Sequence, residues 1–214
     1  MADFLDAGGQ IASVQALSVD GTSGTILGLD RDGRPCTAAL MYNDGRAIEQ
    51  AAQLNDWSGN TGAISASWSL AKMLWLAEHD PTGFERTQVF AHQADYIVAK
   101  LTGLMGYSDE SNALKSGYDL QARDWPHWIA SKSPLAPKLP RVVEPGVPIA
   151  CLLPTVANDL GLPADLKVVA GATDGTAAFI ASGAREVGQD NTTLGTTLVF
   201  KRLSRAPVVD PDGL

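Results

Sequence analysis

The 214-residue sequence is poor in cysteine and histidine, and it contains no long apolar run. Its two cysteines, Cys36 and Cys151, lie too far apart in sequence to form a metal-binding or redox motif, so two buried or half-buried thiols are expected. No stretch of 18 apolar residues occurs, so the sequence predicts no membrane span. The first basic residue is Arg31, so no signal peptide is predicted and a cytoplasmic protein is expected.

Several motifs of nucleotide-binding and hydrolytic enzymes are also missing. No Lys follows a Gly, which excludes the P-loop, and no two glycines are spaced i, i+2, which excludes the dinucleotide fingerprint. Thr25 stands where a Gly-x-Ser-x-Gly nucleophile elbow around Ser23 would need glycine. With 16 Lys+Arg against 24 Asp+Glu the net charge is −8, which argues against nucleic-acid and membrane partners. A small phosphorylated ligand stays possible, because backbone N–H groups can hold it.

The composition that is present, 45% hydrophobic and 19% charged, is that of a globular protein with one sizeable core. The patterning predicts an α/β fold, with strands first, helices next and a strand–helix–strand segment last. The opening is predicted as antiparallel strands joined by tight turns, one of them at the Asp-Gly of residues 30–35. The other expected elements are strands at 11–19, 26–29 and 166–172, helices at 70–77, 90–101, 124–131 and 174–184, an extended connection at 133–148, and a strand pair at 191–194 and 197–201.

Two loops could carry chemistry. Residues 20–25 combine two glycines with three hydroxyl side chains, which suits a sugar or a phosphate but also an unliganded turn. Asp174 is expected where a buried strand meets a helix, at the edge of an α/β sheet where ligands usually bind. From position alone, Asp174 is equally well explained as a helix cap.

The histidines and two of the tryptophans have structural explanations. His79, His92 and His127 are predicted to be surface or hydrogen-bonded histidines rather than metal ligands, and no metal-binding residue is assigned. Trp68 and Trp75 lie seven residues apart on one predicted helix. Packing in the core is the favoured role for this pair, and an aromatic platform for a sugar is the alternative.

Six motifs in a fixed order resemble those of the FGGY carbohydrate kinases, and within them the pentulose kinases for D-ribulose or D-xylulose. The motifs are Val19–Thr25, Leu40–Arg46, Ser108-Asp109 with Asn112–Lys115, Glu144–Gly146, Ala172–Gly175 and Thr193–Thr197. The resemblance covers about residues 11–205. It implies an actin-like, ribonuclease H-like fold, and transfer of a phosphoryl group from ATP to a sugar hydroxyl with Mg²⁺ as cofactor.

The resemblance also implies residue roles. Asp174 corresponds to the family's catalytic aspartate. Sugar contacts fall on the residues Thr22, Ser23, Asn43, Asp44, Arg46 and Asp109, and nucleotide contacts fall on Gly195 and Thr196. Glu110 stands where many family members have tyrosine next to the sugar. The serine at position 23 favours D-ribulose over D-xylulose.

The domain interpretation follows from the same resemblance. Residues 1–205 are predicted to be an incomplete N-terminal sugar-binding domain that lacks its first hairpin, and residues 206–214 a tail towards an absent C-terminal nucleotide domain. Expected partners are a small sugar and either a second copy of the chain or a complementing C-terminal domain. A kinase that is inactive as an isolated chain is the main hypothesis. A non-catalytic sugar-binding or interaction remnant, or an unrelated α/β domain with purely structural loops, are the alternatives.

Overall fold

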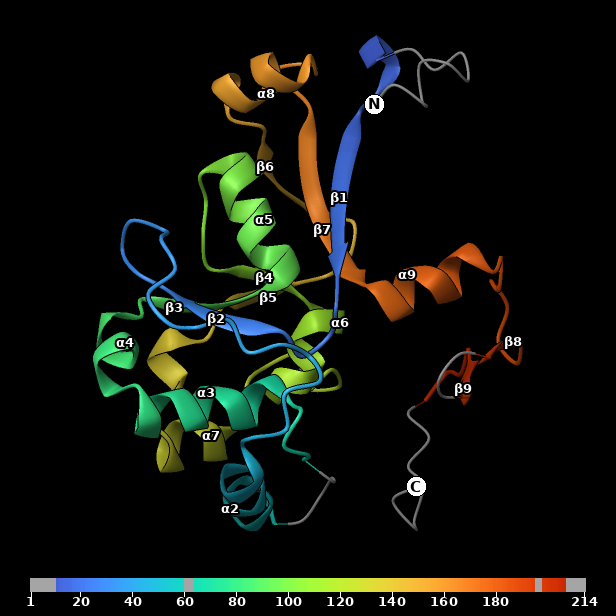
Figure 1. The fold of residues 1–214 in the computed structure, drawn as a ribbon. Helices are drawn as coiled ribbons and strands as arrows, with labels where there is room; N and C mark the ends of the chain where they lie inside the picture. Colours follow the sequence, from blue (N-terminus) through green and yellow to red (C-terminus); the bar gives the residue numbers. More distant parts are fainter. Residues whose placement is uncertain (1–10, 60–63, 195–197, 207–214) are drawn as a thin grey trace.

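The computed structural model describes residues 11–59, 64–194 and 198–206, and it has the mixed α/β architecture that the sequence predicts (Figure 1). The strands are β1 (Ala16–Gly21), β2 (Ile26–Leu29), β3 (Val89–His92), β4 (Tyr107–Asp109), β5 (Arg141–Val143), β6 (Pro148–Cys151), β7 (Lys167–Thr173), β8 (Asp190–Leu194) and β9 (Leu198–Arg202). The helices are α2 (Ile48–Ser58), α3 (Ser69–His79), α4 (Pro81–Arg86), α5 (Gln93–Thr102), α6 (Glu110–Ala113), α7 (His127–Lys132), α8 (Pro154–Leu160) and α9 (Asp174–Ala181). Short 3-10 turns are η1 (Ile11–Ser13), η2 (Leu114–Ser116) and η3 (Ala136–Lys138).

The sheet that carries the site has the order β1-β7-β6, with β1 and β7 parallel and β6 antiparallel to β7. Helix α5 packs along β1 and β7, and α9 leaves the carboxyl end of β7 (Figure 1). Val168 is fully buried, and Leu152, Leu166 and Val98 pack around it to form the core of this half. The carboxyl ends of β1 and β7 therefore point the same way, which places the residues that follow them at one edge of the sheet.

The opening differs from the prediction in two ways. The first strand begins at Ala16, because residues 11–13 form a 3-10 turn. The second strand does not pair with the first: β1 pairs with β7, and β2 pairs with β3 in antiparallel register. The prediction of tight turns holds beyond β2, where Leu29 bridges Pro35 and Ile26 bridges Leu40. The pairing of β2 with β3 is accompanied by burial: Ile26 and Leu29 are both 0% exposed, Ile26 in a second core and Leu29 in a smaller cluster that includes Val89 of β3.

The second core lies between α3, β3 and the neighbouring helices. Leu70, Met73, Leu74 and Phe90 are at most 3% exposed there, which confirms the helical face predicted for residues 70–77. Trp68 and Trp75 are partly buried against this cluster, as their favoured role requires. The Trp75 ring stacks on His79, with 4.4 Å between ring centroids.

Of the helix expected over residues 90–101, only the part that begins at Gln93 is helical. Phe90 belongs to strand β3, whose four residues are all buried, and α5 begins after His92. Asp95 accepts a hydrogen bond from the His92 backbone N–H at 2.9 Å, which closes a capping box at the start of α5. The apolar spacing of 90–101 therefore spans a strand and a helix that pack in different cores, with Phe90 in the cluster around α3 and Val98 and Leu101 in the cluster around Val168.

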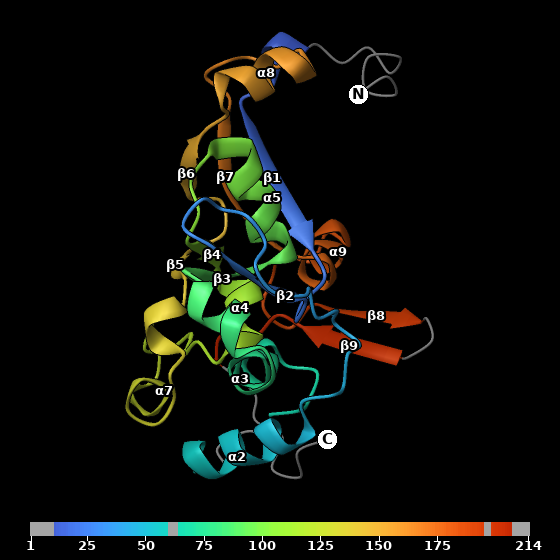
Figure 2. The same cartoon turned by 60° about the vertical axis from the view of Figure 1, so that its left-hand side comes forward.

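The remaining predictions hold with shifted ends. Helix 124–131 begins three residues late because Pro126 is its N-cap, and the connection 133–148 contains η3 and β5 and runs into β6. Strand β7 and helix α9 confirm the segments predicted from 166 and 174. The strand pair is confirmed as β8–β9, a hairpin that projects from the body beyond α9 (Figure 2).

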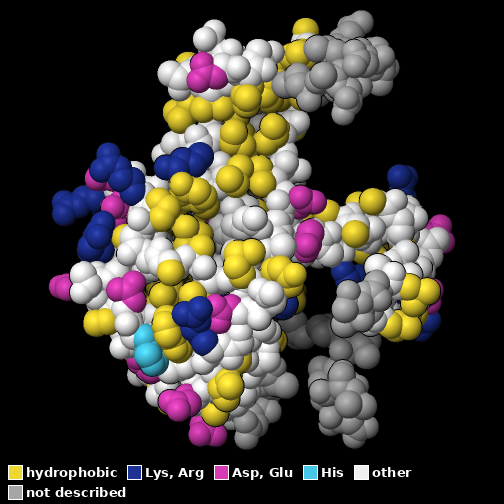
Figure 3. Space-filling view, viewed as in Figure 1, with side chains coloured by type: hydrophobic (Ala, Val, Ile, Leu, Met, Phe, Trp, Pro, Cys, Tyr) yellow, Lys and Arg dark blue, Asp and Glu magenta, His cyan; other side chains and the backbone are white. Residues whose placement is uncertain are grey.

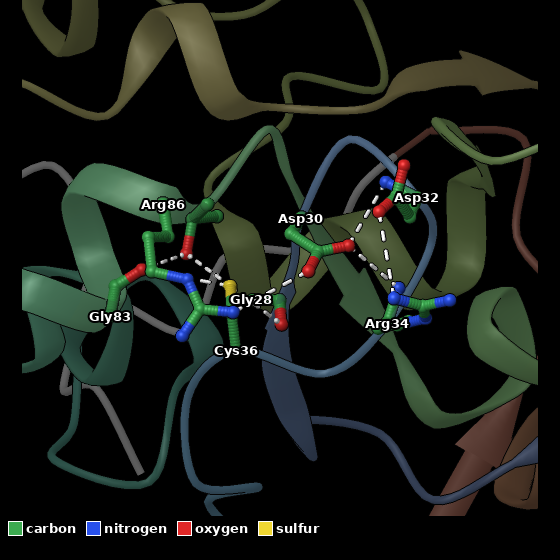
Figure 4. Close-up of polar contacts among 8 residues, drawn as sticks. Gly28, Asp30, Asp32, Arg34, Cys36, Gly83 and Arg86 are labelled. Carbon is green, nitrogen blue, oxygen red and sulfur yellow. Dashed lines mark hydrogen bonds and ion pairs between the residues drawn. The ribbon is translucent and has the colours of Figure 1, made fainter.

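The turn after β2 is closed by a carboxylate (Figure 4). Asp30 accepts hydrogen bonds from the backbone N–H groups of Asp32 and Arg34, both at 3.0 Å, and Arg86 lies 3.5 Å from its other oxygen. The hydrogen bond from the Arg34 backbone is the main reason that the pKa of Asp30 is lowered. The ionised form of Asp30 therefore stabilises this turn.

We expect Asp30→Ala to lower the melting temperature at pH 7. Because the pKa of Asp30 is lower in the folded protein, its stabilisation is fully present above the unfolded-state pKa and is lost as pH falls through the folded-state pKa. The difference in melting temperature between Asp30→Ala and wild type should therefore shrink below about pH 4. Thermal melts at pH 7 and pH 3 test this. Asp32→Ala is the matched control, because within the described part of the chain the Asp32 carboxylate has only an exposed ion pair with Arg34, at 3.7 Å. Equal effects of the two substitutions would contradict the assignment.

The two cysteines differ in their exposure. Cys36 is half-buried, with its sulfur 3.4 Å from the carbonyl oxygen of Gly28 (Figure 4), whereas Cys151 is exposed, contrary to expectation. In the part of the chain that the structure describes, no helix has the length and apolarity needed to cross a membrane.

Candidate functional site

Two segments with predicted roles leave the same edge of the sheet. In the parallel register of β1 and β7, Gly21 lies opposite Thr173, so Thr22 and Asp174 follow neighbouring strand ends. Adjacent strands are about 4.8 Å apart, so these two residues start close together. At this edge Thr22 is half-buried and Asp174 is exposed, and the α9–β8–β9 region stands out from the body of the protein (Figure 3). The structure thus brings together the predicted catalytic residue and the hydroxyl-rich loop.

Asp174 is the first residue of α9, and its side chain is exposed rather than held in the interior. One carboxylate oxygen accepts a hydrogen bond from the Gly175 backbone N–H at 2.6 Å. Lys201 of β9 donates a hydrogen bond to the Gly175 carbonyl, so the hairpin is anchored beside Asp174. The N-cap position itself is Thr173, so Asp174 is free to face solvent.

The loop of residues 20–25, which we call the hydroxyl loop, is held by hydrogen bonds to its neighbours. Thr22 donates its backbone N–H and its hydroxyl to the side-chain oxygen of Gln93, at 3.1 and 2.9 Å. The Thr22 and Thr25 hydroxyls are 2.6 Å apart. Among the residues that the structure describes, the half-buried Ser23 hydroxyl has no hydrogen-bond partner. Ser23 is therefore the member of this loop whose hydroxyl is available to a ligand.

The Asn43–Arg46 segment is placed by a different set of contacts. The Asp44 carboxylate binds the Arg46 guanidinium through Nε at 2.9 and 3.0 Å and through Nη2 at 2.8 Å. These bonds lower the pKa of Asp44 and raise the pKa of Arg46. The Arg46 guanidinium lies over the Trp75 ring, 4.9 Å from its centroid. Because His79 and Arg46 cover Trp75, its ring is engaged within the protein, while Asn43 remains exposed.

Asp109 ends strand β4, where it is only 3% exposed. Its two oxygens accept hydrogen bonds from Asn112, one from the backbone N–H at 2.9 Å and one from the side-chain amide at 2.7 Å. Burial raises the pKa of Asp109. This carboxylate caps helix α6 from inside the protein.

His92 confirms the prediction of a hydrogen-bonded histidine. Its ring is 0% exposed, with Nδ1 at 2.7 Å from Asp95 and Nε2 at 2.8 Å from the hydroxyl of Ser116. Ser108 also contacts Nδ1, at 3.0 Å. These hydrogen bonds join β3, α5, β4 and η2 in the interior. Ser116 is 0% exposed, so its hydroxyl is not accessible to a substrate.

A cluster of three hydroxyls joins α6 to the start of α9. The Ser111 hydroxyl lies 2.9 Å from the hydroxyls of both Thr173 and Thr176, which are 3.0 Å from each other. The Thr173 backbone N–H also points to Ser111, at 3.2 Å. Ser111 therefore fixes the strand-to-helix turn that presents Asp174.

Sequence reasoning missed the residues that hold these loops in place. They are Gln93, Ser111 and Lys201, described above, and Lys72, which donates hydrogen bonds to the carbonyl oxygens of Gly24 and Met41. Gln93 and Ser111 lack any motif of their own, and the lysines read as ordinary surface charges in the sequence. The predicted nucleotide contacts Gly195 and Thr196 lie outside the described residues.

A metal site built from several protein ligands is not found in residues 11–59, 64–194 and 198–206, where no group of three His, Cys, Asp or Glu side chains converges. Mg²⁺ that arrives with a nucleotide usually needs only one or two carboxylates besides the phosphates. We assign no described residue to the metal.

The sequence profile of the FGGY family of carbohydrate kinases, N-terminal domain, matches residues 6–181. The chain is 30% identical over 205 residues to a xylulose kinase of Bacillus subtilis, an alignment that covers 89% of the chain and 40% of that protein. It is 32% identical over 165 residues to an autoinducer-2 kinase of an Enterobacter species, covering 75% of the chain and 30% of that protein.

A solved structure of a xylulose kinase shares the fold. The crystal structure of a xylulose kinase from Rhodospirillum rubrum superposes with a TM-score of 0.82 at 24% identity, over 92% of this chain and 42% of that one. At this level of identity the likeness concerns the fold alone. The chain spans about 40% of the length of the first of these relatives.

Proposed function

Because the chain belongs to the FGGY family of carbohydrate kinases, we propose that it supplies the sugar-binding site and the catalytic base of an ATP-dependent ketopentose kinase. The observation that carries the proposal is the position of Asp174, exposed at the carboxyl end of β7 and next to the hydroxyl loop. Family membership removes the alternative of an unrelated α/β domain. Relatives described as xylulose kinases and the serine at position 23 support D-xylulose or D-ribulose as the sugar.

The proposed phosphoryl transfer requires little covalent chemistry from the protein. Phosphoryl transfer depends on alignment, on neutralisation of charge and on a base near the attacking hydroxyl. In the proposed reaction the Asp174 carboxylate accepts the proton of a sugar hydroxyl while that oxygen forms a bond to the γ-phosphorus of ATP. The bond between the γ-phosphorus and the bridging oxygen breaks, and the electron pair leaves with ADP. Mg²⁺ supplies neutralisation of the phosphate charge.

The remaining site residues receive roles that fit their positions. Ser23 donates or accepts a hydrogen bond to the sugar, with Thr22 shaping the loop beside it. Asn43 faces the sugar from the second segment, where Asp44 and Arg46 hold each other in place. Because Asp109 is buried, its effect on sugar binding comes through α6.

Titration calorimetry with D-ribulose, D-xylulose and L-ribulose tests the sugar site directly. We expect saturable heat with at least one of the D-ketoses, and a weaker affinity for the same sugar in Ser23→Ala, because a hydroxyl with no partner among the described residues is free for the ligand. Ser131→Ala on α7 is the control, since its hydroxyl is an exposed helix-end group. Absence of heat with every ketose would remove the sugar assignment. Release of ADP in the presence of ATP and sugar separates a kinase from a sugar-binding protein without turnover.

A further inference from the structure

Lys72 is a charged side chain that is completely buried. It lies in the second turn of α3 and is 0% exposed. Its ammonium group donates hydrogen bonds to the carbonyl oxygens of Gly24, at 3.0 Å, and Met41, at 2.5 Å. Among the described residues, no carboxylate lies within ion-pair distance of this nitrogen. Burying an ammonium group without an ion-pair partner is costly, and here the two carbonyl acceptors offset part of that cost.

The two carbonyls come from the two segments that bear the predicted sugar contacts. Gly24 follows Ser23 in the hydroxyl loop, and Met41 precedes Asn43 by two residues. The segments are distant in sequence, and Lys72 binds both through one nitrogen. A second hydrogen bond joins the same two segments: the Tyr42 backbone N–H donates to the Thr25 hydroxyl at 3.0 Å.

The geometry around Gly24 leaves it little freedom to move. Its φ is +87°, and a Cβ added there would lie 3.0 Å from the Ser67 carbonyl oxygen and 3.5 Å from the Lys115 side chain. Both the positive φ and the lack of space beside Ser67, which precedes α3, therefore require glycine at this position. Lys72 fixes the direction of its carbonyl, and with it the orientation of the adjoining Ser23.

From these contacts we infer that Lys72 is a positioning residue of the sugar site, which holds the Gly24 and Met41 carbonyls so that Ser23 and Asn43 face one ligand together. The inference rests on the proposed function for the identity of the ligand, but the clamp itself is a property of the fold. Lys72 does not touch the sugar in this arrangement. Its effect is on affinity, because loosened loops must be ordered again when the ligand binds.

The first test replaces Lys72 by methionine, which keeps the length of the side chain and removes the donors. We expect the dissociation constant for D-xylulose or D-ribulose, measured by calorimetry, to rise at least tenfold. Lys100→Met is the matched control, because Lys100 also donates to a loop carbonyl, that of Gly33 at 3.3 Å, but on the surface and away from the site. We expect that control to stay within twofold of wild type.

Hydrogen exchange separates failure of the clamp from failure of the proposed function. In Lys72→Met, amides of residues 22–25 and 41–44 should exchange faster together, with or without sugar, and in Lys100→Met they should not. Binding within twofold of wild type with unchanged exchange would overturn the inference. If wild type binds no ketose but exchange rises in both segments, the clamp stands and the sugar assignment fails.

The third test uses the unmodified protein, so it does not depend on the folding of a variant. Burial lowers the pKa of Lys72 to about 8. The charged groups that face it are Asp44, which favours the ammonium form, and Lys115, which disfavours it. Hydrogen bonds from a charged donor are about twice as strong as neutral ones, so sugar affinity should be constant up to about pH 7 and fall as pH rises through 8. A profile that is flat from pH 6 to pH 9.5 would contradict the positioning role.

Discussion

Asp174→Asn is expected to lower kcat by about 10²–10⁴-fold and to leave the affinity for the sugar within about threefold of wild type. The substitution keeps the size of the side chain and the hydrogen bond from the Gly175 backbone N–H, because the amide oxygen can still accept it. It removes the only property that the proposed reaction needs from this residue, a basic oxygen near the attacking hydroxyl. The loss should therefore fall on turnover and not on binding.

The measurement requires a protein that contains this chain and phosphorylates the sugar. Steady-state kinetics with saturating ATP give kcat, and calorimetry without ATP gives the sugar affinity. Asp159→Asn is the matched control, since Asp159 is an exposed aspartate on α8, at the opposite end of the sheet (Figure 1). Turnover of Asp174→Asn within threefold of wild type would remove Asp174 from its assigned role. A comparable loss in the control would assign the effect to surface charge.

The positions of Asp174 and of the hydroxyl loop could be predicted because both depend on local patterns. A buried strand followed by a helix places Asp174 at a sheet edge, and two glycines around hydroxyl residues mark a tight loop after β1. That these two loops lie side by side, however, depends on the parallel pairing of β1 with β7, two strands about 150 residues apart in the sequence. Local patterns favoured an antiparallel hairpin of β1 and β2 instead.

Lys72 shows why the supporting residues escaped prediction. It lies two positions after Leu70, off the apolar face formed by Leu70, Met73 and Leu74, where a lysine is normally solvated. Its burial comes from two loops that fold over α3, and neither loop signals this in its own sequence. Asp109 has a role that its motif did not indicate. The motif predicts a sugar contact, and in the structure the same carboxylate caps the short helix α6.

The sheet edge that joins the two loops depends on one glycine in β7. The β1–β7 register advances from Ser18–Val169 to Asp20–Ala172, so Ala170 and Gly171 together face the single residue Val19. A Cβ added at Gly171 would lie 2.0 Å from the Val19 carbonyl oxygen and 2.9 Å from its carbonyl carbon. These atoms are backbone, so no side chain can rotate to make room. Glycine inside a strand commonly marks such a bulge and close approach of two backbones.

Gly171→Ala is therefore expected to cost about 3 kcal/mol in the free energy of unfolding, because the clash is relieved only by moving β1 away from β7. Denaturant unfolding measures this, with Gly45→Ala as control: a Cβ at Gly45 meets no atom within 4 Å, so that change should be neutral or slightly stabilising. Where Gly171→Ala remains folded, sugar affinity should fall as well, since Gly21 and Thr173 are paired only a few residues further along. A loss below about 0.5 kcal/mol would mean that the bulge is soft, and the alignment of the hydroxyl loop with Asp174 would then need another cause.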